Sequence, residues 1–247
     1  MQPTFSIITV TFNAELCIRK TIESVIAQTY PDIEYIIIDG NSPDKTVEII
    51  EEHKDRISFF VSEPDNGLYD AMNKGLRKAT GDYVWFLNAG DCIKTPDTVK
   101  RIALLSEQYS IPDIIYGETD LTDAHGNVFA ERRLRSPEDL SWKSFRMGML
   151  VSHQAFIAKR SISPEFDLKY RFSSDFDWCI RCMKQAKIIL NSNRILSNYM
   201  EGGLTLKYHK TSLKERYKIM SGYYGKIPTF FMHGWFAIRF YFTKLSK

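Results

Sequence analysis

The first 110 residues alternate between short apolar runs and segments in which apolar residues recur at helical spacing. The apolar runs predict strands at 5–10, 33–39, 57–62 and 83–87. The helical spacing predicts helices after Asn13 (as the N-cap) up to Pro31, after 42–44 with Pro43 in the first turn, over 68–78, and from 95 onward. This alternation predicts an α/β protein with a mostly parallel, doubly wound sheet flanked by helices.

The second half of the chain is less regular. We expect strands at 113–118, 128–134, 152–159 and 188–190, and a helix over 175–185. From residue 207 the composition changes to Lys, Arg, Tyr and Phe with almost no acid. This tail, residues 207–247, predicts two amphipathic helices that are broken at 225–228.

Composition and charge narrow the class of protein. The 247 residues are 44% hydrophobic and 26% charged, which excludes disorder and coiled coil and is typical of a globular domain. The net charge is only +3 and both signs are interspersed, although the last 40 residues carry most of the excess, so no nucleic-acid partner is expected. Four cysteines are too few for a secreted disulfide scaffold, and the apolar stretch 230–242 is shorter than the roughly 20 residues that span a bilayer. We expect a cytoplasmic protein.

Polar residues follow four predicted strands in succession. In an α/β sheet these strand ends line the ligand crevice. The residues concerned are Thr11, Asn13, Asp39, Glu63, Asp65 and Asp91. A single carboxylate at such a place is often a turn former or a helix cap, but four ends in a row predict a ligand site. The glycine fingerprints of dinucleotide and P-loop proteins are absent from the sequence, which disfavours those classes.

Several segments resemble family 2 glycosyltransferases, which have the GT-A fold. The four stronger segments match in order and spacing over residues 4 to about 92, and they are 6–13, 38–42, 63–75 and 80–91. Two weaker segments, 152–156 and 173–181, resemble the acceptor side of the family and extend the likeness to about residue 205. The resemblance implies a catalytic domain over 1–206, with a nucleotide-sugar half at 1–92 and an acceptor half at 93–206. The tail lies outside it.

The resemblance also implies how the donor nucleotide is bound. Asp39 would accept a hydrogen bond from a ring N–H of the base, which favours uracil or guanine, and Thr11 and Asn13 would line the same pocket. Asp65 and Lys74 would lie near the donor. The sequence around Asp65 is also a good turn sequence in any protein, so a turn alone is the alternative there.

The metal of the family is bound by an Asp-x-Asp motif, which corresponds here to the segment Asn88-Ala89-Gly90-Asp91. The resemblance implies that this segment contacts the donor and that Asp91, its one acid, holds Mg²⁺ or Mn²⁺ against the leaving diphosphate. One carboxylate can suffice, because Mg²⁺ keeps waters and takes phosphate oxygens as ligands. The alternative is a tight turn in which Asp91 is only a cap.

The general base of an inverting transfer is implied at Asp175, and Asp177 is the second candidate. Either carboxylate could also be an ordinary acid at a helix N-terminus. Arg181 follows Asp177 by four residues, so an ion pair on one helix face competes with a role in binding diphosphate. His153 and Gln154 could bind acceptor or phosphate, or could be structural.

These observations predict an inverting glycosyltransferase. It would move a sugar from a nucleotide-diphosphate sugar, UDP-linked by preference and GDP-linked as the second choice, to a hydroxyl of a saccharide or lipid-linked saccharide in surface polysaccharide synthesis. The alternative is a non-catalytic nucleotide-sugar-binding protein, because the metal motif has a single acid. The basic aromatic tail predicts peripheral contact with the anionic inner face of the cell membrane, or else packing on the catalytic domain or across a dimer.

Overall fold

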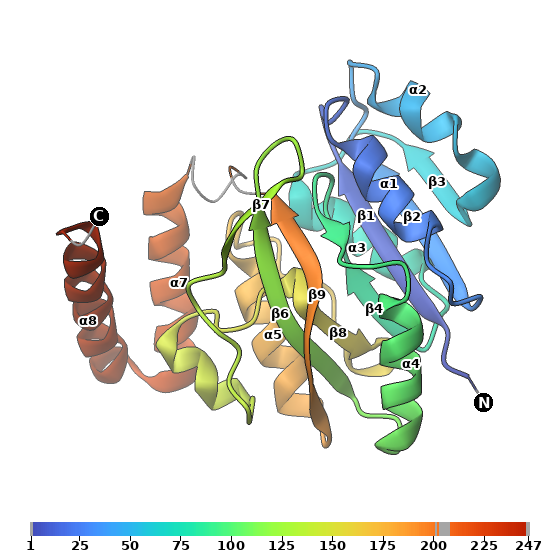
Figure 1. The fold of residues 1–247 in the computed structure, drawn as a ribbon. Helices are drawn as coiled ribbons and strands as arrows, with labels where there is room; N and C mark the ends of the chain where they lie inside the picture. Colours follow the sequence, from blue (N-terminus) through green and yellow to red (C-terminus); the bar gives the residue numbers. More distant parts are fainter. Residues whose placement is uncertain (1, 201, 203–207, 246–247) are drawn as a thin grey trace.

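The computed structural model describes residues 2–200, 202 and 208–245, and Figure 1 shows their fold. A mixed sheet of nine strands runs through this part of the chain in the order β3-β2-β1-β4-β8-β6-β9-β5, and β7 pairs with β6. The strands are β1 (Phe5–Thr11), β2 (Ile33–Asp39), β3 (Phe59–Ser62), β4 (Tyr83–Phe86), β5 (Cys92–Ile93), β6 (Ile114–Thr122), β7 (Val128–Glu131), β8 (Phe156–Lys159) and β9 (Ile189–Met200).

Helices cover both faces of this sheet (Figure 1). The α-helices are α1 (Ile18–Ile26), α2 (Thr46–Glu51), α3 (Leu68–Lys78), α4 (Thr98–Gln108), α5 (Ser174–Gln185), α7 (His209–Tyr224) and α8 (Lys226–Leu245). The 3₁₀ helices are η1 (Lys54–Arg56), η2 (Trp142–Met147), η3 (His153–Ala155) and η4 (Arg160–Ile162).

The strand β1 lies between β2 and β4, and it is parallel to both. All seven of its residues are buried, because Ile8 packs in one apolar cluster with α3 and Ile7 packs in a second cluster with α1 and α4. Helix α3 approaches β1 closely at Gly75, where a Cβ would lie 2.4 Å from Cγ2 of Ile8. The parallel first half and the α/β class are therefore as predicted.

The carboxyl ends of the parallel strands are level with one another. Thr11 of β1 pairs with Asp39 of β2, and Asp39 pairs with Ser62 of β3. This register brings the polar strand ends to one edge of the sheet, as their positions in the sequence predict.

The second half turns the sheet from parallel to mixed. The strand β8 is antiparallel to both β4 and β6, whereas β6 and β9 are parallel to each other. The strand predicted at 188–190 is longer than expected: it continues to Met200 as β9 and pairs with β6 along its length. The strand predicted from residue 152 begins only at Phe156, because 153–155 form η3.

Two helices begin later than the sequence predicts. Asn13 does not cap α1, which begins at Ile18; instead Asn13 has a φ of 51° and turns the chain at the end of β1. Helix α2 begins at Thr46 and not around Pro43, because Asp44 accepts hydrogen bonds from both the backbone N–H and the hydroxyl of Thr46. Both corrections concern the loops beside the strand ends.

The tail forms two helices that are separated at Gly225, which has a φ of 88°, as its sequence predicts. Helix α7 contributes Ile219, Met220 and Tyr224 to the apolar cluster around α5, so this helix completes the core. Lys207 and residues 246–247 lie outside the described residues. Among the described helices, none is both long and apolar enough to cross a membrane.

Candidate active site

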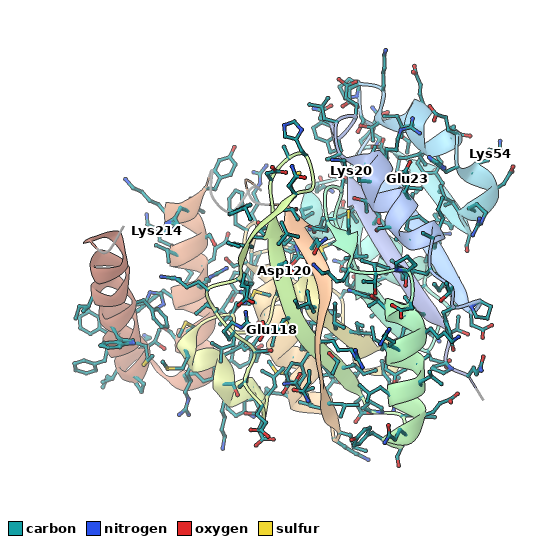
Figure 2. All side chains as sticks on the ribbon, in the orientation of Figure 1. Lys20, Glu23, Lys54, Glu118, Asp120 and Lys214 are labelled. Carbon is teal, nitrogen blue, oxygen red and sulfur yellow. The ribbon has the colours of Figure 1, made fainter. Side chains whose placement is uncertain are left out.

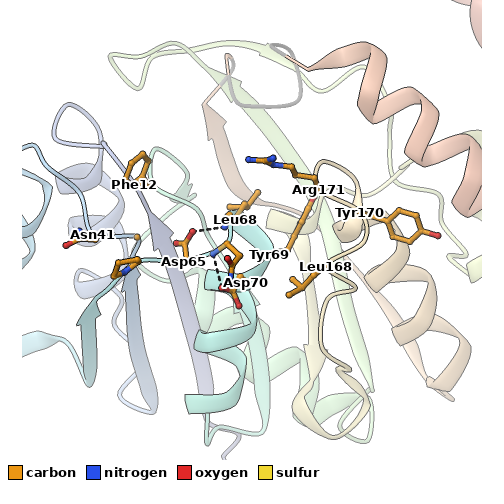
Figure 3. Close-up of a pocket in the computed structure, with 13 residues that line it drawn as sticks. Phe12, Asn41, Asp65, Leu68, Tyr69, Asp70, Leu168, Tyr170 and Arg171 are labelled. Carbon is orange, nitrogen blue, oxygen red and sulfur yellow. Dashed lines mark hydrogen bonds between the residues drawn. The ribbon is translucent and has the colours of Figure 1, made fainter.

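A pocket of about 770 Å³ opens at the carboxyl edge of the parallel strands. Its walls come from the loops after β1 and β2, the loop before α3, the first turn of α3 and the loop before α5. Figure 3 shows Phe12 on one side, Leu168 and Arg171 on the other, and Asp65 between them. The pocket thus joins the predicted nucleotide-sugar half to the predicted acceptor half.

Asp39 lies beneath this pocket and does not line it. It is fully buried, and its carboxylate accepts hydrogen bonds from the backbone N–H of Ser42 (2.9 Å), the hydroxyl of Ser42 (2.6 Å) and the hydroxyl of Ser62 (2.6 Å). These bonds hold the loop that places Gly40 and Asn41 in the pocket wall.

Thr11 and Asn13 flank the pocket without lining it. The Thr11 hydroxyl is buried and has no hydrogen-bond partner among the described residues, and the Asn13 backbone N–H donates to the Ser42 hydroxyl at 2.9 Å. The residue between them, Phe12, lines the pocket and is 60% exposed. Sequence reasoning missed Phe12, although an aromatic residue between two polar ones at a strand end was a usable signal.

Asp65 lines the pocket, and its Oδ1 accepts the Gly67 backbone N–H at 2.7 Å, the bond of the turn that the sequence allows. It also reaches the β2 loop, since a Cβ on Gly40 would lie 2.6 Å from its Oδ2. Lys74 is not in the pocket wall. Its ammonium group pairs with Glu63 and donates to the carbonyl of Pro64, both at 2.8 Å, so it braces the loop that carries Asp65.

The segment 88–91 forms a tight turn in which the Asp91 backbone N–H donates to the Asn88 carbonyl at 2.9 Å. Ala89 is tied to the end of β1 by a backbone hydrogen bond to Val10, and Gly90 has a φ of 99° and donates its N–H to Thr21 at 2.9 Å. The turn is therefore anchored to β1 and α1, beside the strand ends.

Asp91 is almost completely buried at the end of this turn. Its Oδ2 accepts the Gln154 side-chain amide at 2.9 Å and its Oδ1 accepts the Met200 backbone N–H at 3.2 Å. Burial raises the pKa of Asp91 to about 6, against the opposing effect of these bonds and of the His153 charge. A buried carboxylate that costs this much to ionise is a usual feature of functional sites.

The residues of this turn fit a divalent cation that takes most of its ligands from elsewhere. The side-chain oxygen of Asn88 is buried and has no hydrogen-bond partner among the described residues, so the turn offers this oxygen together with the Asp91 carboxylate. Within the described residues, no three His, Cys, Asp or Glu side chains form a metal cage. Mg²⁺ binds through one or two protein oxygens plus water and phosphate, which matches this donor set.

Asp175 lies at the N-terminus of α5 and joins the pocket to the 88–91 turn. Its Oδ1 accepts the hydroxyl of Tyr69, a residue of the pocket wall, at 2.9 Å, and its Oδ2 lies 3.2 Å from Nδ1 of His153. The other ring nitrogen of His153 lies 3.3 Å from the Asn88 amide. The fold thus brings together four residues that are far apart in the sequence.

Neighbouring charges and burial shift the pKa of Asp175 in opposite directions. Burial alone would raise its pKa, but the hydrogen bond and charge of His153, the charge of Arg216 and the Tyr69 hydroxyl lower it below its usual value. Asp175 is therefore ionised at neutral pH and can accept a proton. Its position beside the pocket agrees with the role implied for it in the sequence.

Asp177 faces away toward α7. Its carboxylate pairs with Arg181 at 2.7 Å and accepts the Tyr223 hydroxyl at 2.8 Å. The i,i+4 pair that the sequence allows is therefore formed, and both groups serve the contact between α5 and α7. Gln154, by contrast, is part of the site through its bond to Asp91.

Helix α7 holds the loop before α5, a feature that sequence reasoning missed. The Glu215 carboxylate accepts the backbone N–H groups of Arg171 and Phe172, at 2.9 and 2.8 Å, and the Ser212 hydroxyl lies 2.9 Å from that of Ser173. Glu215 is the single acid in residues 207–247, and this isolation among basic residues was the available signal.

Comparison of the sequence with known proteins identifies the family. The family described as Glycosyl transferase family 2 matches residues 6–163. A PGL/p-HBAD biosynthesis glycosyltransferase of Mycobacterium bovis (strain BCG / Pasteur 1173P2) is 30% identical over 215 residues, which cover 82% of this chain and 79% of that protein. An uncharacterized glycosyltransferase of Haemophilus influenzae is 26% identical over 213 residues, which cover 85% of this chain and 84% of that protein.

Solved structures share the fold. The crystal structure of S. aureus TarS superposes with a TM-score of 0.70 at 17% identity; the match covers 90% of this chain but only 43% of the TarS chain. The mannosyltransferase PcManGT from Pyrobaculum calidifontis, in complex with GDP-Man and Mn²⁺, gives a TM-score of 0.64 at 16% identity and covers 88% of this chain and 64% of that one. A TarS fragment, residues 1–349, is also solved with UDP-GlcNAc. These likenesses agree with the GT-A fold that the sequence motifs imply.

Proposed function

Because the chain belongs to glycosyl transferase family 2 and is a glycosyltransferase, we propose that it moves a sugar, with inversion, from a nucleotide-diphosphate sugar to a hydroxyl acceptor. The observation that carries the proposal is the position of Asp175. This ionised carboxylate is bonded to a residue of the pocket wall and, through His153, is connected to the 88–91 turn.

The donor occupies the pocket between Phe12 and Arg171 in this proposal. The exposed Phe12 ring offers a flat face to a nucleobase, and Arg171 lies across the pocket from it, with Asp65 between them. We propose a UDP-sugar as the preferred donor and a GDP-sugar as the second choice. Two structural neighbours support a nucleotide sugar in general, since one is solved with UDP-GlcNAc and the other with GDP-Man.

We propose that Asp91 and the side-chain oxygen of Asn88 hold Mg²⁺ or Mn²⁺ when the donor binds. A divalent cation there would supply positive charge to the leaving diphosphate. Gln154 orients the Asp91 carboxylate through its amide, and Met200 does so through its backbone N–H. The Mn²⁺ in the Pyrobaculum mannosyltransferase supports a divalent metal in this fold.

Asp175 accepts the proton of the acceptor hydroxyl as that oxygen attacks the anomeric carbon. Tyr69 and His153 hold the two carboxylate oxygens in place, so the base is oriented before the acceptor arrives. A single carboxylate is enough for inversion, because the acceptor attacks on the face opposite the leaving diphosphate. Asp177 is committed to Arg181 and Tyr223 and does not take part.

The acceptor in this proposal is a saccharide or a lipid-linked saccharide of a surface polysaccharide. A lipid-linked acceptor would bring the enzyme to the anionic inner face of the cell membrane as a peripheral protein. The mycobacterial relative, which is named for PGL/p-HBAD biosynthesis, supports a role in building a glycoconjugate.

Nucleotide release from UDP-GlcNAc and GDP-mannose tests this function. We expect nucleotide release to stop with EDTA and to resume with added Mn²⁺. Release should be much slower in the Asp175→Asn variant. If neither these nor other UDP- and GDP-sugars release nucleotide, although they raise the melting temperature, the chain is instead a non-catalytic nucleotide-sugar-binding protein. Family membership and the placement of Asp175 do not favour that alternative.

A further inference from the structure

The outer face of helix α8 carries an exposed apolar stripe. Figure 1 shows α8 as the outermost element, with α7 between it and the rest of the protein. The five large residues of the stripe are between 50% and 73% exposed, and they are Ile227, Phe230, Phe231, Trp235 and Ile238. Their spacing of three and four residues puts them on one side of the helix. Water therefore meets a continuous apolar surface over about three turns.

The opposite side of α8 is packed, which fixes the direction of the stripe. Thr229 is buried, and Met232 and Phe236 pack against the apolar cluster that contains the buried residues of α7. His233 lies edge-on to the ring of Tyr217 on α7, with 5.2 Å between the centroids. Because these contacts use one side of the helix, the stripe cannot turn inward without breaking them.

Charge is strongly segregated between the tail and the rest of the chain. Residues 207–247 contain nine Lys and Arg against one acid, whereas residues 1–206 contain 24 Lys and Arg against 29 acids. The exposed lysines of these two helices are Lys210, Lys214 and Lys218 on α7 and Lys226 at the start of α8. Figure 2 shows Lys214 on α7, the helix next to α8. The one acid, Glu215, is engaged by the loop before α5 and leaves this positive charge uncompensated.

The combination of stripe and charge distinguishes between the partners that could cover this face. In a symmetric contact between two copies, the same positive tail would face itself, which is unfavourable. In an anionic bilayer the aromatic rings can be buried at the boundary between headgroups and acyl chains, and the lysines can meet negatively charged headgroups. Helix α8 is also unsuited to cross a bilayer, so its place would be in the plane of the interface.

We propose that the stripe of α8 inserts into the interfacial region of an anionic bilayer, with the lysines of α7 and α8 at the headgroups. The proposal deepens the proposed function, since it names the surface through which a lipid-linked acceptor would be met. Binding to the bilayer itself needs no catalysis, so the proposed membrane surface and the proposed glycosyl transfer can be disproved separately.

Trp235 provides a direct test in the full-length protein. It is half exposed, Trp85 and Trp178 are fully buried, and Trp142 is partly buried against Tyr224. In a Trp142→Phe background, a change in fluorescence on binding therefore reports mainly on α8. We expect vesicles of phosphatidylcholine with phosphatidylglycerol to shift the emission to shorter wavelength and to pellet the protein. Vesicles of phosphatidylcholine alone should do so weakly, and salt should reduce the binding to anionic vesicles.

A variant that keeps the tryptophan separates the stripe from charge alone. The triple substitution Ile227→Ser, Phe230→Ser, Phe231→Ser should weaken binding to anionic vesicles at least tenfold without changing the melting temperature. Phe129→Ser on β7 is the matched control, because Phe129 is an equally exposed ring outside the tail. Nucleotide release from a soluble donor should be the same in the wild type and in both variants, whatever the vesicle result.

Three outcomes would overturn the proposal. Wild-type protein that stays unbound to anionic vesicles has no such membrane surface. Equal binding by the wild type and the triple variant would mean that the stripe does not insert. A wild-type dimer that the triple variant converts to a monomer in sedimentation velocity would assign the stripe to a second copy of this chain.

Discussion

Replacing Asp91 by Asn should stabilise the metal-free protein while removing the proposed metal binding. The carboxylate of Asp91 is buried, and among the described residues it accepts hydrogen bonds from the Gln154 amide and the Met200 backbone N–H. Neither carries a full charge that would offset the loss of water. An amide of the same shape has no charge to bury, so the variant avoids this cost.

The magnitude follows from the pKa of Asp91, which burial raises from 3.8 to about 6. This difference of about two units corresponds to about 3 kcal/mol of unfolding free energy that the charged form loses at neutral pH. Because the folded pKa is the higher one, the penalty is absent below the unfolded pKa, grows between the two values and is complete above about pH 6. At pH 5 it is about half as large.

Hydrogen bonding reduces the gain in the variant. An Asn side chain at position 91 presents one N–H₂ group where the carboxylate has two acceptors, so the amide of Gln154 must turn. Its neighbour Ser152 can accept as well as donate a hydrogen bond, which allows the turn at a cost of about 1 kcal/mol. The expected net gain at pH 7.5 is therefore about 2 kcal/mol.

Urea unfolding with EDTA, at pH 7.5 and at pH 5, measures this gain as the difference between wild type and Asp91→Asn. We expect a clear gain at pH 7.5 and a much smaller one at pH 5. In a second series, Mn²⁺ with UDP should stabilise the wild type and not the variant. A variant that is less stable at both pH values, or equally stabilised at both, would refute the assignment of a buried charge at Asp91.

Three further substitutions test the remaining parts of the site. Asp175→Asn should keep donor affinity in calorimetric titration with Mn²⁺ and slow transfer by roughly 10²–10⁴-fold; if Asp177→Asn is the slower enzyme, the base lies at Asp177. Phe12→Ala should weaken UDP binding roughly tenfold and Phe12→Tyr should not, and equal affinities would remove the ring from the base site. Glu215→Gln should lower the unfolding free energy by about 1–2 kcal/mol, because its N–H₂ group faces a backbone donor, and should raise KM for the donor, because Arg171 lines the proposed donor pocket; an unchanged KM would make Glu215 purely structural.

The strands of the nucleotide-sugar half could be predicted because their signals are local. The apolar run 35–38 within β2 predicts burial on both faces, and the polar residue directly after it marks the strand end. The parallel register then brings Thr11, Asp39 and Ser62 to one edge without further information. The family motifs carried the same information about the fold.

The partners of each site residue depend on packing over long distances in the chain. Asp91 meets Gln154, 63 residues away, and Asp175 meets Tyr69 at a separation of 106 residues. Hydrogen bonds form only within about 3 Å, so such pairs depend on how whole elements pack, and no short-range pattern encodes them. For this reason the sequence does not indicate that Asp39 and Lys74 hold the loops that line the pocket, and their place near the donor stays a prediction.

The tail shows the same division most clearly. Its composition alone is enough to predict two basic, aromatic helices with a break near Gly225, because residue type and helical period are properties of the sequence. Which rings face the protein and which face water is decided by the tertiary structure. Helix α7 fills the gap beside α5 and covers one side of α8, and the apolar residues that remain on the other side have no protein surface left to bury them.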